Sequence, residues 1–197
     1  GKGAGAALTL GTSNVAVGYL ALQTNTEGSY NTCVGYESLE VYQAAATNEG
    51  YNTSVGYRAG RFVEVGEYNT FIGSVAGQGI TSDRLDGDGN TAIGSYAGLE
   101  LEGAAHANTF VGEYAGSTTE AGYENTCIGR AAKAQDDTAH NQIVIGNNLA
   151  GTKDNAVFIG NDSSHIENDF NADATWNHSS DVRQKTDIKD DVLGLNF

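Results

Sequence analysis

The stretch Asn90-Thr91-Ala92-Ile93-Gly94-Ser95-Tyr96-Ala97-Gly98 is one copy of a short phrase that recurs along the chain. Its core, Asn-x-x-Val/Ile-Gly, begins at Asn14, Asn31, Asn52, Asn69, Asn90, Asn108 and Asn125, and two variants begin at Asn141 and Asn155. The copies close at Gly18, Gly35, Gly56, Gly73, Gly94, Gly112, Gly129, Gly146 and Gly160, so they lie 17, 21, 17, 21, 18, 17, 17 and 14 residues apart. Nine copies at so short a period predict an all-β parallel solenoid whose coils bury apolar side chains against their neighbours.

Two successive positions in each copy carry apolar side chains. The position before the glycine is β-branched: Val17, Val34, Val55, Ile72, Ile93, Val111 and Ile128. The position before that reads Ala16, Cys33, Ser54, Phe71, Ala92, Phe110 and Cys127. Because side chains alternate between the faces of a strand, these strands are expected to be buried on both faces. We assign Ile72 and Val111 to the coil interior, and Phe71 and Phe110 to contacts with two identical chains around a threefold axis.

Composition restricts the partners of this 197-residue chain. It has 27 glycines and no proline, which suits many tight turns, and its formal net charge is −15. That charge argues against nucleic acid and anionic membranes as partners, because a basic surface is missing. No apolar run approaches the roughly 18 residues of a membrane span, and no signal peptide is recognisable, so membrane insertion is not expected.

The segments between the copies contain turns and aromatic residues. Each of four repeat glycines is followed by a second short motif, at 57–60, 74–77, 95–98 and 113–116, whose glycine suits a corner with positive φ. The connectors 40–50 and 78–89 account for the 21-residue intervals and are expected to carry binding loops. The tyrosines around the repeats could stack on sugar rings or form a structural ladder along the coil edges, and we favour the ladder.

The copies resemble the Gly-x-Asn-Asn-Thr-Ala-Val-Gly-Tyr-x-Ala-Leu repeats of bacteriophage tail fibres, with Asn31-Thr-Cys-Val-Gly-Tyr-Glu-Ser-Leu39 as a close instance. The last two copies also resemble the heads of YadA-type trimeric adhesins, whose turn has 14 residues. Over residues 14–160 this resemblance implies a left-handed parallel β-roll that assembles as a homotrimer. Residues 1–13 are expected to form a lead-in or a degenerate first turn.

The C-terminal region departs from the repeat. Residues 161–180 are predicted to be a neck in which three chains interlace, with Ile166, Phe170 and Trp176 as plugs on the axis. The run Ser180-Asp181-Val-Arg183-Gln-Lys185-Thr-Asp-Ile188 resembles the opening of the self-cleaving intramolecular chaperone of phage tailspikes and fibres. Residues 181–197 would be the start of that domain, which is much longer in the family.

The resemblance implies a single-turnover autoproteolysis rather than a turnover enzyme. Ser180 would be the nucleophile and Lys185 the base, since a serine hydroxyl must lose its proton and a buried lysine can accept it. The family's cut falls between Ser180 and Asp181, whereas an acyl shift would cut before Ser180. Arg183 belongs to the same motif. The alternative is a polar linker without chemistry.

Other reactive residues give weaker patterns. Cys33 and Cys127 lie five coils apart, at about 24 Å for strands spaced by about 4.8 Å, so we predict two buried thiols near the trimer axis and no disulfide. His106, His140, His165 and His178 have no zinc-ligand spacing, and no metal or other cofactor is predicted. Residues 86–90 resemble the start of a calcium loop, but Ala97 replaces its glutamate.

Two functions remain. The first is a structural and receptor-binding part of a trimeric tail fibre in a virion, which contacts other tail proteins and a carbohydrate or protein on the host surface. The second is the head of a bacterial surface adhesin without self-cleavage, although the heptads of an adhesin neck are absent from 161–197. A polysaccharide-cleaving enzyme ranks third, because the acidic segments 83–88 and 100–102 form no evident pair of catalytic carboxylates.

Overall fold

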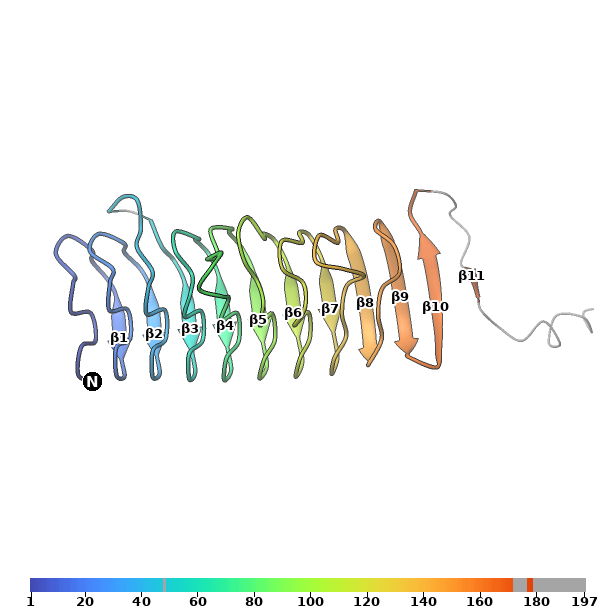
Figure 1. The fold of residues 1–197 in the computed structure, drawn as a ribbon, viewed down its shortest axis with the longest axis horizontal. Coiled ribbons are helices and arrows are strands. Elements are labelled where there is room, and N and C mark those ends of the chain that lie inside the picture. The colour runs from blue at the N-terminus through green and yellow to red at the C-terminus, as the bar shows by residue number, and fades with distance from the viewer. Residues whose placement is uncertain (48, 172–176, 179–197) are drawn as a thin grey trace, which may run out of the picture.

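The computed structural model describes residues 1–47, 49–171 and 177–178, and within these ranges the chain is all-β. It forms a parallel β-solenoid of about nine turns, as the repeat predicted, drawn as a rod in Figure 1. One sheet runs along the rod with its strands in sequence order. The strands are β1 (Val15–Val17), β2 (Thr32–Val34), β3 (Thr53–Val55), β4 (Thr70–Ile72), β5 (Thr91–Ile93), β6 (Thr109–Val111), β7 (Thr126–Ile128), β8 (Gln142–Asn147), β9 (Ala156–Asn161), β10 (Ser164–Asp169) and β11 (Asn177–His178).

The repeat sets the register of the sheet. Strands β1 to β9 pair in parallel with their neighbours, and equivalent residues stand opposite each other, as Phe71 does to Ala92 and Ala92 to Phe110. Most of these strands have three residues, whereas β8 and β9 have six. A side chain of each coil therefore packs on its counterparts in the coils before and after it, which is how a solenoid builds a continuous core.

The predicted assignment of the two strand faces is wrong. Phe71 and Phe110 are fully buried inside the coils, whereas Ile72 on the same strand as Phe71 is 38% exposed. The reason lies in the repeat asparagine, whose side chain is buried in the interior. Because side chains alternate along a strand, the residue two positions after the asparagine faces inward with it, and the β-branched residue faces outward.

The buried asparagines form a hydrogen-bonded ladder through the rod. In each step the Oδ1 of one asparagine accepts from the backbone N–H of the next: Asn14 to Asn31 at 2.9 Å, Asn31 to Asn52 at 3.1 Å, Asn52 to Asn69 at 2.9 Å, Asn69 to Asn90 at 2.8 Å, Asn90 to Asn108 at 3.2 Å and Asn108 to Asn125 at 3.1 Å. Their Nδ2 groups donate across the coil to backbone carbonyls such as that of Ala105. Buried amides cost little when they are satisfied in this way.

The repeat glycines allow successive coils to approach closely. Gly94 has φ of 132°, in a region that side chains disfavour, and a Cβ there would collide with the backbone carbonyl of Gly112 in the next coil. Gly35, Gly56, Gly73, Gly112 and Gly129 have the same geometry against the following coil. Glycine is therefore required at this position by both conformation and space.

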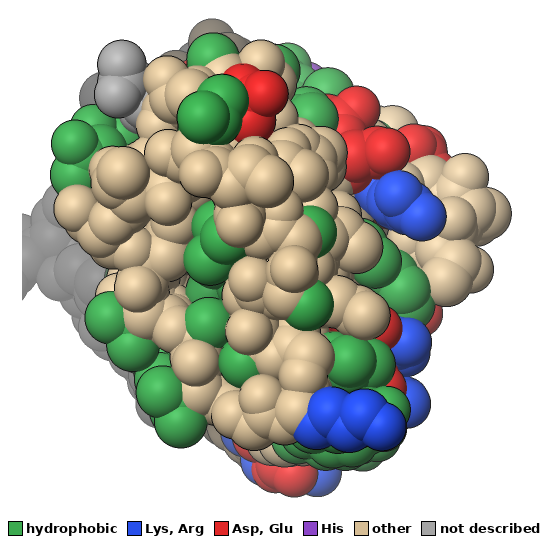
Figure 2. Space-filling view, turned by 90° about the vertical axis from the view of Figure 1, so that its left-hand side faces the viewer, with side chains coloured by type: hydrophobic (Ala, Val, Ile, Leu, Met, Phe, Trp, Pro, Cys, Tyr) green, Lys and Arg blue, Asp and Glu red, His purple; other side chains and the backbone are tan. Residues whose placement is uncertain are grey.

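The first residues of the chain belong to the solenoid. Residues 1–13 contain no strand, but their backbone bonds to the coil of β1, for example from the Leu20 N–H to the Lys2 carbonyl at 3.0 Å. Figure 2 looks at this end of the rod, where hydrophobic side chains lie along the left margin, through the centre and at the right, and charged ones are absent from the left margin. The rod thus presents different chemistry on different sides.

The C-terminal end has a different construction. Strand β10 turns back and pairs antiparallel with β9, and the two residues of β11 pair antiparallel with β10. This hairpin covers the last parallel strand, and the repeat pattern did not predict it. Within the segment expected to be a neck, the backbone of Ile166 is in register with that of His178, Phe170 is 53% exposed, and Trp176 lies outside the described residues.

Candidate functional site

The outward face of the sheet is the most extensive candidate binding surface. It carries a threonine and a β-branched residue from each of strands β2 to β7, as in Thr91 and Ile93 of β5. Val17, Ile72, Ile93, Ile128 and Ile159 are all among the exposed large hydrophobic residues. A continuous apolar row on a monomer marks a surface made for contact. We call this row of outward Thr, Val and Ile side chains the outer stripe.

Two tyrosine ladders flank the outer stripe in the first coils. Tyr30 lies two residues before Thr32, and Tyr36 two residues after Val34, so the two ladders adjoin opposite ends of the short strands. The rings stack between coils with centroid separations of 4.7 and 5.1 Å in the ladder Tyr30–Tyr51–Tyr68, and of 5.2 and 5.4 Å in the ladder Tyr19–Tyr36–Tyr57. A shorter stack joins Tyr96 and Tyr114.

This stacking limits which parts of the tyrosine rings can contact a ligand. The inner rings of each ladder have a neighbouring ring against both faces, so only ring edges and hydroxyls can meet a ligand. Tyr51, for example, stacks on Tyr30 and Tyr68 and is still 43% exposed. A sugar that needs a free aromatic face cannot stack on such a ring, which supports the structural interpretation of the ladders.

An ion-pair cluster crosses two coils beside the second ladder. The Arg61 Nε lies 3.1 Å from Glu37 Oε2 and 2.6 Å from Glu40 Oε2, and the Arg58 Nε lies 2.8 Å from Glu37 Oε2. The Glu37 side chain is only 7% exposed, so its charge is compensated by two guanidinium groups rather than by water. The Arg58 guanidinium also lies over the Tyr57 ring at 5.0 Å. This cluster fixes the connectors and leaves no reactive group free.

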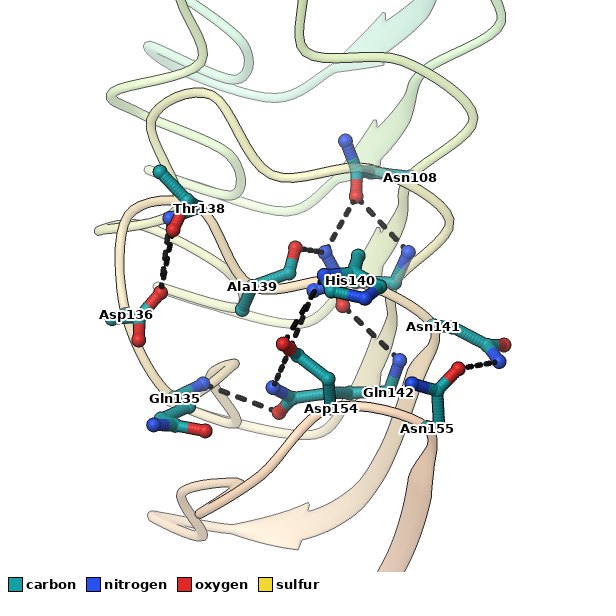
Figure 3. Close-up of polar contacts among 11 residues, drawn as sticks. Asn108, Gln135, Asp136, Thr138, Ala139, His140, Asn141, Gln142, Asp154 and Asn155 are labelled. Carbon is teal, nitrogen blue, oxygen red and sulfur yellow. Dashed lines mark hydrogen bonds and ion pairs between the residues drawn. The ribbon is translucent and has the colours of Figure 1, made fainter. Parts of the chain in front are cut away.

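The asparagine ladder ends in a polar network, shown in Figure 3. Gln142 replaces the asparagine, and its N–H donates to Asn125 Oδ1 at 3.2 Å. Asp154 of the next coil accepts from the Gln142 Nε2 at 3.1 Å and from the His140 N–H at 2.8 Å, and its Oδ2 lies 3.1 Å from His140 Nδ1. The His140 ring stacks on Tyr123 at 5.0 Å. These contacts join coils and resemble no catalytic arrangement.

The residues predicted to cleave the chain cannot be placed. Ser180, Asp181, Arg183 and Lys185 all lie outside the described residues, so their roles stay predictions.

The described part of the chain offers no metal centre. Within it, no three or more His, Cys, Asp or Glu side chains gather in a way that could hold an ion. In the calcium-like segment the Asn90 side chain belongs to the ladder, and Asp88 Oδ1 accepts from the Glu67 N–H at 2.7 Å. No described helix is long and apolar enough to cross a membrane.

Both cysteines are free and buried, as predicted, but they face the interior of the coils rather than an axis between chains. Burial raises the pKa of the Cys33 and Cys127 thiols to about 12, because a thiolate would lose its hydration there. The thiols are therefore packing groups and poor nucleophiles at neutral pH.

Backbone conformation is the feature that sequence reasoning missed most. Tyr30, Tyr51 and Tyr68 have φ of 63°, 56° and 57°, although such values cost a residue with a side chain about 1–2 kcal/mol. Their recurrence just before Asn-Thr is the signal that could have revealed a corner there. Stacked rings and a bonded asparagine on the next residue offset that cost.

No family model, curated protein or solved structure matches this chain.

Proposed function

We propose that this chain is a shaft segment of a trimeric tail fibre of a virion, with a left-handed coil and a role in attachment to the host. The observation that carries the proposal is the outer stripe, an apolar row along one side of a rod whose core is already complete without it. Three such rods can bury their stripes against one another around a common axis.

The size of the stripe corresponds to a small interface between copies. About nine turns spaced by about 4.8 Å give a rod of roughly 43 Å. Three strand residues at about 3.3 Å each give a width of roughly 10 Å, and the tyrosine ladders widen the surface only in the first coils. The resulting area is on the order of 400 to 600 Å² per chain, below the roughly 800 Å² per partner of a standard interface and within the range of small ones.

The oligomeric state tests this part of the proposal. Light scattering on the chain should give the mass of a trimer, and Ile72→Asp combined with Ile93→Asp should give a folded monomer, because a charge on the stripe would be buried without a partner. Thr118→Asp on an exposed connector is the matched control and should remain trimeric. A wild-type monomer would contradict the proposal.

The processing step is supported by the resemblance at Ser180 to Lys185. A mass spectrum of the full-length gene product should show two fragments, whereas Ser180→Ala and Lys185→Ala should each show one, because the hydroxyl then is missing or stays protonated. Residues 1–197 expressed alone should be cut as the full-length product is if they hold the whole site, and should stay uncut if residues outside them help to bury Lys185 and to stabilise the oxyanion.

A second candidate is the head of a bacterial trimeric adhesin on the cell surface. The observation that favours it is the final repeat interval, the 14 residues between Gly146 of β8 and Gly160 of β9. Both of these strands have six residues. Both candidates share the trimer. A full-length product that never cleaves near Ser180 would favour the adhesin.

A further inference from the structure

At Gly79 one coil has no side chain, whereas the coils on either side carry side chains at the neighbouring positions. A surface hollow lies beside Gly79. On the connector side, the Phe62 N–H donates to the Gln78 carbonyl at 2.9 Å, and the Gly79 N–H donates to the Leu99 carbonyl at 3.0 Å. Gly79 thus lies between a coil that carries Phe62 and a coil that carries Leu99 and Glu100. The hollow measures about 330 Å³, at the small end of the roughly 300–1,000 Å³ range of ligand sites. We call it the Gly79 slot.

The Gly79 slot lies between coils whose separation equals the space that one aromatic ring fills in the tyrosine ladders. Coils two apart are separated by about 9.6 Å. In the tyrosine ladders, a ring in the middle coil fills that space, as Tyr51 does at 4.7 Å from Tyr30 and 5.1 Å from Tyr68. Without a side chain at Gly79, the same space can accept one ring from a ligand.

Phe62 offers that ligand a free aromatic face. The Arg61 guanidinium lies 4.7 Å from the centre of the Phe62 ring, and Arg61 is held by Glu37 and Glu40 of the preceding coil. The covered face of Phe62 is therefore the one toward the preceding coil, which leaves the other for the coil of Gly79. Phe62 differs in this from the inner tyrosines, whose two faces are both stacked.

The polar groups around the slot suit a ligand with several hydroxyls. Gln78 can both donate and accept through its amide, Thr81 through its hydroxyl, and Glu100 can accept through its carboxylate. Ile80 and Leu99 complete the lining with apolar surface. A purely aromatic ligand would leave the three polar groups without partners, and an acidic one would be repelled by Glu100 and by a chain of net charge −15.

We propose that the Gly79 slot binds one uncharged pyranose ring of a glycan, with a C–H face of the sugar against Phe62 and its hydroxyls on Gln78, Thr81 and Glu100. This inference deepens the proposed attachment role and rests on it for its biological meaning.

The test titrates the chain with the methyl pyranosides of glucose, galactose, mannose and N-acetylglucosamine, and follows saturation-transfer NMR and the backbone amide signals of Gly79 and Thr81. At least one of these sugars should saturate the protein with a millimolar Kd and shift both amides. Phe62→Ala should raise that Kd at least tenfold, and Thr81→Val severalfold, whereas Thr118→Val on another exposed connector should leave it unchanged.

The outcomes separate this proposal from the fibre assignment. If no pyranoside binds, if binding survives both Phe62→Ala and Thr81→Val, or if methyl glucuronide binds more tightly than the neutral sugars, the slot proposal is wrong. Amide spectra of each variant verify folding, and the milder Thr81→Val keeps the test valid if Phe62→Ala unfolds. Trimer mass is measured independently, so a trimer that binds no sugar refutes the slot alone, and a sugar-binding monomer refutes the trimeric fibre alone.

Discussion

The inward and outward faces of the same short strands differ in what they need from the rest of the molecule. On strand β4, Phe71 is fully buried within its own chain, whereas Ile72 is 38% exposed. The inward face also holds the asparagine ladder, in which each amide bonds to the next coil. The outward face is β-branched and equally regular, yet it has no intrachain partner of comparable extent. One face therefore holds the coil together, and the other is available for assembly.

Under the proposed trimer, this difference assigns folding and association to separate residues. Changes to inward side chains should act on the stability of a single chain, whereas changes to the outer stripe should act on the mass of the assembly.

Phe110→Asp should unfold the solenoid rather than only separate its chains. The Phe110 side chain is fully buried, and the substitution both leaves a cavity and places a carboxylate in an apolar interior, at a cost of at least about 4 kcal/mol. Circular dichroism and chemical denaturation should show loss of the β signal or a much lower midpoint. Thr118→Asp on an exposed connector should leave the midpoint nearly unchanged. A folded Phe110→Asp monomer would restore the original assignment of the faces.

Asn90→Ala should destabilise the chain without changing its charge. It removes the acceptor for the Asn108 N–H and Nδ2, and the donor to the Ala105 carbonyl, all of which are buried. Each polar group left without a partner costs about 1–3 kcal/mol, so a loss of roughly 3 kcal/mol in the free energy of unfolding is expected. Asn141→Ala, on an exposed asparagine that bonds Asn155, serves as the control and should cost much less. Equal losses would mean that the ladder contributes little.

Tyr51→Ala should have a smaller effect. Tyr51 stacks on two rings while Tyr114 stacks on one, so its removal deletes two contacts of about 0.5–1.5 kcal/mol each and Tyr114→Ala deletes only one. Denaturation of the two variants, whose residues both have positive φ near 57°, compares the ladders with little difference in backbone strain. If the Tyr114 variant loses more, the stacked rings do not stabilise the rod.

The repeat allowed the solenoid, the parallel register and the buried free thiols to be predicted, because each follows from spacing alone. It did not reveal the faces, since both apolar positions of the strand fit a buried interior and the spacing does not show on which face the polar asparagine lies. Only its bonds to the next coil make an interior site favourable, and such bonds arise when coils stack. The Gly79 slot was equally hidden, because it depends on which side chains of different coils share one row. The antiparallel β10 left no periodic pattern to detect.

Glu102→Gln should give the smallest effect and a specific dependence on pH. One oxygen of this side chain, Oε2, is buried without a hydrogen-bond partner. Burial, followed by the nearby charges of Glu120 and Asp83, a hydrogen bond with the Glu120 side chain and the charge of Glu100, raises the pKa of Glu102 above its ordinary value of 4.5. The folded chain therefore holds this proton more tightly than the unfolded chain, so the free energy of unfolding falls as pH rises from the pKa of the unfolded chain through that of the folded chain.

Thermal unfolding of the wild type should give a lower midpoint at pH 7 than at pH 5. In Glu102→Gln the midpoint at pH 7 should rise slightly and its decline with pH should weaken, because the amide has no charge to bury. The exposed Glu124→Gln changes the net charge equally and should leave the pH profile nearly as it is in the wild type. If both variants flatten the profile to the same extent, the effect comes from net charge, and the buried position of Glu102 has no part in it.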